Sequence, residues 1–223
     1  MPRAAVLTKL LNLICAVDRP HPVRVAIDGV DASGKTTLAN ELVPLIEARG
    51  RSVIRASIDG FHNPRDVRYR LGTDSPEGYY RDSFNYEILQ RDLLLPLGPG
   101  GNRRYRGAAF NFWKDAAIPE IWDEAPANAI LLFDGVFLLR PALIQHWDFS
   151  VFVDVDFDIS VPRAVARDVA QSSEPLASET VLAKYNQRYV PGQQIYLAEA
   201  QPEEHATVII QNDDLANPKL IFP

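Results

Sequence analysis

The stretch from Arg24 to Leu42 reads RVAIDGVDASGKTTLANEL and decides the fold of this chain. Its first residues are mostly apolar and predict a strand, and a helical pattern follows the glycine-bracketed loop. Residues 29–36 match the pattern G-x-x-x-x-G-K-[ST] at every position. That pattern is typical of a strand, loop and helix that together bind the phosphates of a nucleoside triphosphate. The sequence therefore predicts a phosphate-binding loop.

Each residue type in this loop suits the binding of phosphate. Glycines let backbone N–H groups approach phosphate oxygens, and the first turn of the following helix adds unpaired N–H groups and a positive dipole end. We expect Lys35 to contact the β- and γ-phosphates and the Thr36 hydroxyl to ligate Mg²⁺. The predicted nucleotide-binding residues are Gly29, Asp31, Ala32, Ser33, Gly34, Lys35, Thr36 and Thr37.

The composition is that of an ordinary globular protein, with 223 residues, 47% of them hydrophobic and 23% charged. This length allows one sizeable core, although length alone leaves two small domains open. The net charge of −6 argues against a broad surface for nucleic acid. Cys15 is the only cysteine, so no internal disulfide can form and a cytoplasmic location is expected.

Residues 1–20 predict an amphipathic helix packed on the domain. Lys9 interrupts the apolar run, and no small-residue cleavage site of the kind found in signal peptides follows it. The apolar side chains that share one helical face are Val6, Leu7, Leu10, Leu11 and Ile14. No apolar run approaches the roughly 20 residues that span a bilayer, so no membrane partner is expected. Whether the protein forms a homo-oligomer stays open.

Short apolar runs alternate with helical stretches, which is typical of a parallel α/β sheet. The expected strands are 24–28, 52–57, 129–134, 149–155 and 206–211, and the expected helices are 35–49, 86–95, 141–146, 159–171 and 179–200. Residues 96–126 have no clear period and are rich in Gly, Pro and Arg, which predicts a long excursion near the site.

Three aspartates follow predicted strands. Asp59 stands at the carboxyl end of the second strand, where ligands bind in open α/β sheets, and we interpret it as a catalytic carboxylate; Asp59-Gly60 is also a turn former. Asp134 ends the apolar run AILLFD and is predicted to hold Mg²⁺. For Asp28 we favour a structural role, bracing the loop through hydrogen bonds.

Several segments, taken in order, resemble the uridine kinase and phosphoribulokinase family of P-loop kinases. They are IDGVDASGKTTLANEL, SIDGFH, DSFNYEIL, LLFDGVFLL, FSVFVDVDFDISVPRAVARD and ATVIIQN. The resemblance implies a three-layer α/β P-loop NTPase fold, Rossmann-like, with a five-stranded parallel sheet and a helical lid. It also implies ATP, Mg²⁺ and phosphoryl transfer to a hydroxyl group. We expect a single kinase domain over residues 1–223, with the lid at 160–190.

Carried over by position, the resemblance makes Asp59 the catalytic aspartate and places Asp134 where the family usually has a glutamate. Thr36, Asp59 and Asp134 form the implied metal set, and Lys35 joins the catalytic residues. Arg163 and Arg167 match lid arginines that close over the phosphates. Their spacing of four residues puts both on one helical face, where guanidinium groups suit phosphoryl charge; a solvated helix face is the alternative.

At the implied acceptor site, this sequence departs from the family at several positions. Phe84 and Asn85 align with an aromatic-aspartate pair that holds the nucleoside in uridine kinases, so an amide replaces the acid. Tyr105 falls near a base-stacking tyrosine, but the histidine expected after it is absent, and ordinary packing is the alternative for Tyr105. His62 could contact the acceptor or lie on a turn surface. The basic residues Arg65, Arg68 and Arg70 either attract an anionic acceptor or lie on a loop, and the loop is favoured.

These observations predict an ATP-dependent kinase that phosphorylates a hydroxyl of a small molecule, a nucleoside or similar compound. Two alternatives stay open. Asp31 in the loop resembles thymidylate kinases, so a nucleoside monophosphate kinase is one. The other is a nucleotide-binding regulatory protein without kinase activity, in which the acceptor site around Asn85 has been lost.

Overall fold

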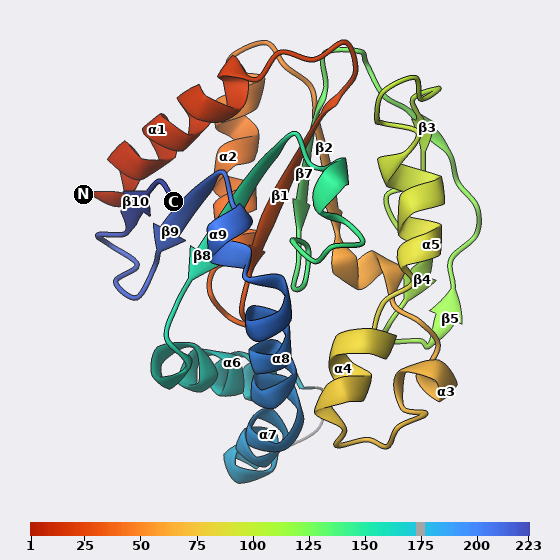
Figure 1. Ribbon diagram of the computed structural model, residues 1–223, viewed down its shortest axis with the longest axis vertical. Helices are drawn as coiled ribbons and strands as arrows, with labels where there is room; N and C mark the ends of the chain where they lie inside the picture. Colours follow the sequence, from red (N-terminus) through yellow and green to blue (C-terminus); the bar gives the residue numbers. More distant parts are fainter. Residues whose placement is uncertain (173–176) are drawn as a thin grey trace.

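A six-stranded sheet forms the centre of the computed structural model, which describes residues 1–172 and 177–223 (Figure 1). The order is β10-β9-β8-β1-β7-β2, with five parallel strands and β10 antiparallel at one edge. The strands are β1 (Val23–Gly29), β2 (Val53–Ser57), β7 (Ile130–Asp134), β8 (Phe149–Asp154), β9 (Val208–Gln211) and β10 (Lys219–Ile221). The predicted parallel core is confirmed. Strand β10 is additional, because three residues with mostly exposed side chains carry little apolar pattern.

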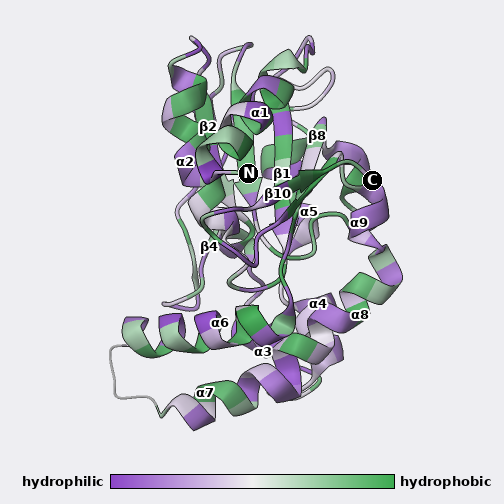
Figure 2. Ribbon diagram, turned by 90° about the vertical axis from the view of Figure 1, so that its left-hand side faces the viewer, coloured by the Kyte–Doolittle hydropathy of each residue, from purple (hydrophilic) through white to green (hydrophobic). Residues whose placement is uncertain are grey.

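Helices cover both faces of the sheet. Helices α1 (Arg3–Ala16) and α2 (Lys35–Glu47) pack on one face, where α1 buries Val6, Leu10, Leu11 and Ile14. A second hydrophobic cluster on the other face includes residues of α8 (Val190–Ala200) and α4 (Pro76–Asp82). Figure 2 shows hydrophobic residues along the strands and, alternating with hydrophilic ones, along the helices. This arrangement is the predicted three-layer α/β fold.

Most of the remaining elements are short. The helices are α3 (Arg65–Arg68), α5 (Tyr86–Leu89), α6 (Phe157–Gln171), α7 (Ser178–Lys184) and α9 (Pro202–His205). Two π-helical turns, Gln90–Leu94 and Tyr185–Tyr189, extend α5 and α7, and two 3₁₀ turns occupy Ile58–Phe61 and Ile144–His146. Two small antiparallel hairpins pair β3 (Arg104–Tyr105) with β6 (Asp123–Glu124) and β4 (Phe110–Asn111) with β5 (Ala116–Ala117).

Several segments differ from the prediction, and helices α3, α4 and α9 lie in none of the expected helical ranges. In place of the helix expected at 141–146, the structure has only the 3₁₀ turn Ile144–His146. The excursion at 96–126 contains the two hairpins, which were hidden by strands of two residues each.

Helices α6 and α7 pack on one another beyond the sheet (Figures 1 and 2). Most of α6 and all of α7 lie within residues 160–190, the predicted lid, which also includes 173–176, outside the described residues. Closure of this lid over a nucleotide stays a prediction.

The carboxyl ends of three parallel strands meet at one edge of the sheet. Asp134, the last residue of β7, lies opposite Ile27 of β1 and Ser57 of β2. The loop after β1 and the 3₁₀ turn after β2 therefore lie next to the end of β7. This edge is the place where the predicted site residues come together.

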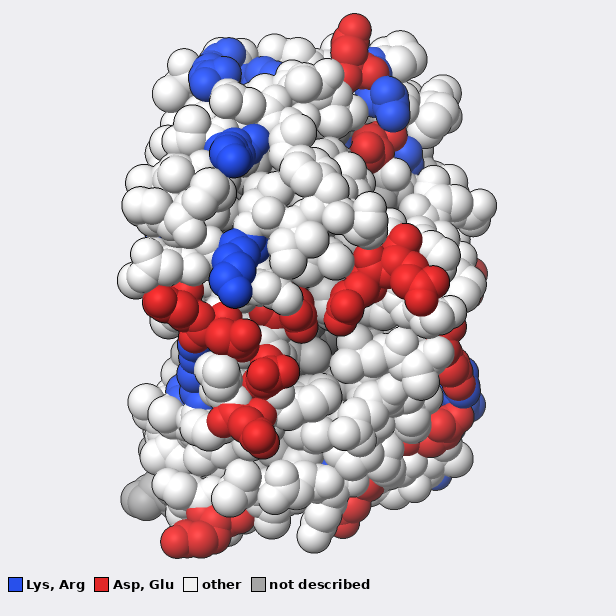
Figure 3. Space-filling view, turned by 60° about the vertical axis from the view of Figure 1, so that its left-hand side comes forward, with Lys and Arg blue, Asp and Glu red and all other residues white. Residues whose placement is uncertain are grey.

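The surface reflects the net charge of −6. On the face shown in Figure 3, acidic side chains form a band across the middle, and basic side chains are scattered. Among the described residues, no helix combines the length and the apolar character that crossing a membrane requires.

Candidate active site

The loop between β1 and α2 is closed by two glycines in conformations that favour glycine. Gly29 has φ of 148° and Gly34 has φ of 98°. A Cβ atom at Gly29 would overlap the carbonyl oxygen of Val153, and one at Gly34 would lie 2.8 Å from Nδ2 of Asn212. Close packing on the backbone of β8 thus excludes a side chain at Gly29, and the positive φ at Gly34 would strain any other residue there.

The backbone N–H groups of the loop fall into two sets. Some have no hydrogen-bond acceptor among the described residues: those of Ala32, Gly34, Lys35, Thr36 and Thr37. Two others are used within the protein, because Ser33 donates to Val30 O (3.2 Å) and Asp31 donates to Gln193 Oε1 (2.6 Å). The free set includes the first turn of α2 and can donate to phosphate oxygens. The N–H groups of Asp31 and Ser33 already have acceptors within the protein, so the predicted contact of these two residues with a nucleotide stays a prediction.

Lys35 lies over the loop with its side chain buried. Its Nζ donates to Val30 O (2.5 Å) and lies 3.5 Å from Ser33 Oγ. Burial lowers the pKa of Lys35, and the carboxylates of Asp31 and Asp28 oppose this effect. The ammonium group is therefore held where a polyphosphate bound by the loop would lie.

Thr36 and Asp134 are joined by a hydrogen bond in which Thr36 Oγ1 donates to Asp134 Oδ2 (2.5 Å). The other carboxylate oxygen of Asp134 accepts from Arg55 Nη2 (2.9 Å). Arg55 lies on β2 and also donates to the carbonyl oxygen of Leu132 (2.7 Å). The guanidinium group therefore fixes the carboxylate of Asp134 with one oxygen toward the loop.

Asp59 lies in the 3₁₀ turn Ile58–Phe61 that follows β2. Loss of solvation raises the pKa of the Asp59 carboxyl group, and the negative charge of the nearby Asp134 carboxylate raises it further. The positive charges of Lys35 and Arg167 oppose this rise. An aspartate with a raised pKa is a stronger base than an ordinary one, so Asp59 is suited to accept a proton.

One large cavity of about 1210 Å³ connects the loop with an aromatic wall. The His62 ring centroid lies 4.6 Å from that of Phe84 and 4.5 Å from that of Phe112. His62 Nδ1 is 3.0 Å from the carbonyl oxygen of Asp59. All four residues line the cavity, so an acceptor next to Asp59 would contact this wall.

Arg167 of α6 also lines the cavity. It donates to Asp168 Oδ1 (2.9 Å) and to the hydroxyl oxygen of Tyr185 (3.1 Å). Its positive charge lowers the pKa of both Asp31 and Asp59 and so opposes the rise that burial causes at each.

Residues 25–213, most of the chain, match the Phosphoribulokinase / Uridine kinase family. The chain belongs to this family. It is a kinase that transfers a phosphoryl group to a hydroxyl group of a small molecule, as predicted.

Curated relatives carry consistent names. Uridine-cytidine kinase B of Dictyostelium discoideum is 27% identical over 191 residues, which cover 85% of this chain and 74% of the relative. A uridine kinase of Leuconostoc citreum (strain KM20) is 28% identical over 154 residues, 66% of this chain and 69% of the relative.

Solved structures share the fold of this kinase. A possible uridine kinase from Bacillus stearothermophilus superposes with a TM-score of 0.72 at 22% identity, covering 92% of this chain and 97% of that one. A putative fructose transport system kinase from Silicibacter sp. TM1040 gives the same TM-score of 0.72 at 24% identity, covering 90% and 96%. At these identities the likeness shows the fold alone.

Five residues predicted for the site lie outside the lining of the cavity of this kinase: Gly29 and Ser33 within the loop, and Asn85, Tyr105 and Arg163. Asn85 caps α5 by accepting from the N–H of Ile88 (3.0 Å). Tyr105 packs against the hydrophobic core. Arg163 donates to backbone carbonyl oxygens of Asn212 (3.3 Å) and Asp213 (2.6 Å). The predicted roles of the last three would require their side chains to move.

Other residues of the site carried no sequence motif. Tyr79 and Gln193 both donate to Asp31 Oδ2, at 3.2 and 3.3 Å, and thereby fix the loop to α4 and α8. The sequence did contain one indication of the role of Arg55, because a charged residue in the middle of a short strand needs an oppositely charged or hydrogen-bonding partner. Asp28 has the expected structural role: it accepts from the N–H groups of Gly29 and Leu139 and from the Tyr196 hydroxyl, and burial raises its pKa.

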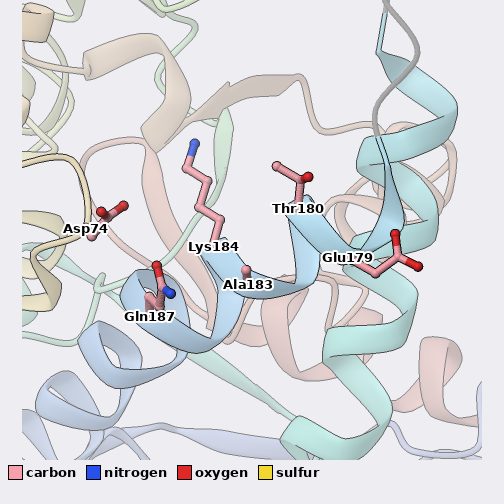
Figure 4. A pocket seen from close by; sticks show the side chains of 6 residues that line it. All are labelled: Asp74, Glu179, Thr180, Ala183, Lys184 and Gln187. Atoms are coloured by element: carbon pink, nitrogen blue, oxygen red, sulfur yellow. The ribbon is translucent and has the colours of Figure 1, made fainter.

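A smaller hollow of about 510 Å³ lies next to α7 (Figure 4). Its lining residues are Asp74, Glu179, Thr180, Ala183, Lys184 and Gln187. Lys184 also lines the main cavity, so the two hollows meet at this side chain.

Proposed function

We propose that this kinase transfers the γ-phosphoryl group of ATP, with Mg²⁺, to a hydroxyl group of a nucleoside or a similar small molecule. One observation carries the proposal: Lys35, the Thr36–Asp134 pair and Asp59 line a single cavity next to free loop N–H groups. The names of the curated relatives make uridine and cytidine the first acceptors to test.

The residues at the loop suit Mg²⁺. Thr36 and Asp134 present hard oxygen atoms 2.5 Å apart, and Asp59 is close enough for the two carboxylates to repel each other. Among the described residues, no group of three or more His, Cys, Asp or Glu could hold a metal alone. This pattern agrees with Mg²⁺, which usually takes one or two carboxylates and completes its shell with substrate phosphates and water. When bound, Mg²⁺ would neutralise charge on the phosphate oxygens.

The protein groups would act in three ways. The free loop N–H groups and Lys35 bind the triphosphate and hold the γ-phosphorus in line with the acceptor. Asp59 accepts the proton of the acceptor hydroxyl as its oxygen bonds to that phosphorus and the bond to the β-phosphate oxygen breaks. Arg167 neutralises charge on the transferred group. Positioning and electrostatics account for most of the acceleration in such reactions.

The substitution Asp59→Asn tests this assignment. It removes the proton acceptor and keeps the size of the side chain, so we expect acceptor-dependent ADP release to fall by roughly 10²–10⁴-fold. The affinity for ATP, measured by calorimetry, should change little. Asp66→Asn, on exposed α3, is the matched control. Near-normal transfer by Asp59→Asn would return Asp59 to a turn-forming role.

The same assay separates the alternatives. A nucleoside monophosphate kinase would release ADP with a monophosphate acceptor and not with the nucleoside. A regulatory protein would bind ATP and release no acceptor-dependent ADP. A cytoplasmic location fits the use of ATP and the single cysteine, Cys15.

A further inference from the structure

Arg68 differs from its sequence-based prediction, which favoured the surface of a loop. It ends the short helix α3, and only 4% of its side chain is exposed. It lines the same cavity as Asp59 and the phosphate-binding loop. By contrast, Arg65 on the same helix and Arg70 just after it are exposed or partly exposed.

The guanidinium group of Arg68 is only partly satisfied. Its Nη2 donates to Asp115 Oδ1 (2.7 Å), and its central carbon lies 4.5 Å from the centroid of the Phe112 ring. Its Nε is buried and has no hydrogen-bond partner among the described residues. Buried donors without a partner are rare in folded proteins, and each needs an explanation. Nη1 of Arg68 also makes no hydrogen bond to the described residues and is not among the buried unpaired atoms, so a ligand in the cavity can accept from Nη1.

A second guanidinium group reinforces the positive charge at this end of the cavity. Arg188 is buried, lines the cavity, and donates only to backbone carbonyl oxygens, those of Arg68, Gly72, Thr73 and Ser75. No carboxylate of the described residues lies within ion-pair distance of Arg188. Among the described residues, these two buried guanidinium groups therefore share a single carboxylate partner, Asp115, which pairs with Arg68 and has a side chain that is 31% exposed.

A continuous line of contacts joins Arg68 to the site of phosphoryl transfer. Arg68 contacts Phe112, Phe112 contacts the His62 ring, and His62 contacts the Asp59 carbonyl. All four residues line the cavity. An acceptor whose hydroxyl lies at Asp59 can therefore extend over this wall and place a second group at Arg68.

We propose that Arg68 binds a carboxylate or phosphate of the acceptor, so that this kinase prefers a hydroxylated acid over its neutral analogue. Guanidinium groups match both anions in charge and in the geometry of their donors. The proposal deepens the proposed function and rests on it, because Asp59 must lie at the acceptor hydroxyl.

Matched acceptor pairs provide the test. The pairs are uridine and uridine 5′-monophosphate, ribose and ribose 5-phosphate, and glycerol and D-glycerate. Each compound is tested for acceptor-dependent ADP release, and for binding by calorimetry in the presence of a non-hydrolysable ATP analogue. The phosphorylated position of each product is identified by phosphorus NMR, because a nucleoside monophosphate kinase would phosphorylate the phosphate of uridine 5′-monophosphate and not a hydroxyl group. We expect the anionic member of at least one pair to bind and to be phosphorylated with a higher kcat/KM than its neutral partner. The first two pairs test phosphate, and the third tests carboxylate.

Three variants then separate anion binding from a structural role. Arg68→Met keeps an unbranched side chain that can pack against Phe112 but loses the charge, so kcat/KM for the anionic member should fall roughly 30-fold or more. The neutral member and the KM for ATP should change little. Asp115→Gly tolerates the φ of 47° at this position and removes the contact to Arg68, yet it should keep the preference for the anion. Exposed Arg65→Met is the matched control.

The outcomes are distinguishable. Equal use of neutral and anionic members by the wild-type enzyme, or equal losses for both in Arg68→Met, would overturn the anion site and leave the kinase assignment intact. Absence of binding by every anionic probe would also overturn it. Binding that depends on Arg68 without any ADP release would support the anion site and contradict the proposed phosphoryl transfer.

Discussion

At the scale of single residues, His62 keeps a neutral imidazole next to Asp59. Burial lowers the pKa of His62 to about 4, the Asp59 carbonyl opposes this effect, and the charge of Arg68 adds to it. A neutral ring can lie against Phe84, Phe112 and a bound acceptor without adding to the positive charge of this end of the cavity.

The lowered pKa of His62 predicts acid sensitivity. His62 titrates near 6.5 when unfolded and near 4 when folded, so the unfolded state binds more protons between these values. Its contribution to stability is present above pH 6.5 and is lost as the pH falls toward 4. We expect His62→Gln to reduce the loss of unfolding free energy between pH 7 and pH 4.5, by at most about 3 kcal/mol. Urea unfolding of both proteins at several pH values measures this difference in unfolding free energy.

Exposed His205→Gln serves as the control and should keep the wild-type pH dependence. If His62→Gln loses as much stability with acid as the wild type does, then His62 is not the group responsible.

At the scale of elements, Asn212 at the end of β9 connects three parts of the chain. Its Nδ2 donates to Ser33 O of the phosphate-binding loop (2.7 Å), and its Oδ1 accepts from Arg3 Nη1 of α1 (3.3 Å). Its own carbonyl oxygen accepts from Arg163 of α6 (3.3 Å). The back of the loop is therefore held by one side chain that also contacts the first helix.

Asn212→Ala should loosen the loop, because the buried carbonyl oxygen of Ser33 would lose its donor. Leaving such a group unpaired costs about 1–3 kcal/mol, so we expect roughly tenfold weaker ATP binding by calorimetry together with a lower unfolding free energy. Exposed Asn217→Ala is the matched control. Unchanged ATP affinity in Asn212→Ala would show that the loop keeps its shape without this contact.

At the scale of the whole molecule, α1 belongs to the hydrophobic core. Leu10 is fully buried and packs with residues of β1, α2 and β8. Leu10→Ala should lower the unfolding free energy by about 2–5 kcal/mol while the protein still unfolds in one transition. Leu95→Ala, at a side chain that is 55% exposed, should change it by less than about 1 kcal/mol.

Denaturant unfolding followed by fluorescence and circular dichroism measures both variants. Two separate transitions, with Leu10→Ala affecting only the first, would contradict the predicted single domain and make α1 an independent appendage.

The sequence predicted those features that depend on neighbouring residues. The phosphate-binding loop is complete within residues 29–36, and Asp134 directly follows its own apolar strand, so both could be located before the fold was known. The burial of Arg68 could not be predicted, because it depends on Asp115 and Phe112 of a hairpin more than forty residues later. The contact of Gln193 with Asp31 joins residues 162 positions apart, and no local sequence pattern predicts this contact.

The placement of β1 at the centre of the sheet has a consequence for synthesis on the ribosome. Its neighbours are β7 and β8, and Val23 lies opposite Ile130 while Val25 lies opposite Phe149. The ribosome must therefore synthesise more than a hundred further residues before β1 can pair with its neighbours in the sheet. During that interval the apolar strand β1 is exposed without the strands that pair with it. Contacts between residues so distant in sequence also slow folding. Translation speed and chaperones would act on this protein mainly before β8 emerges.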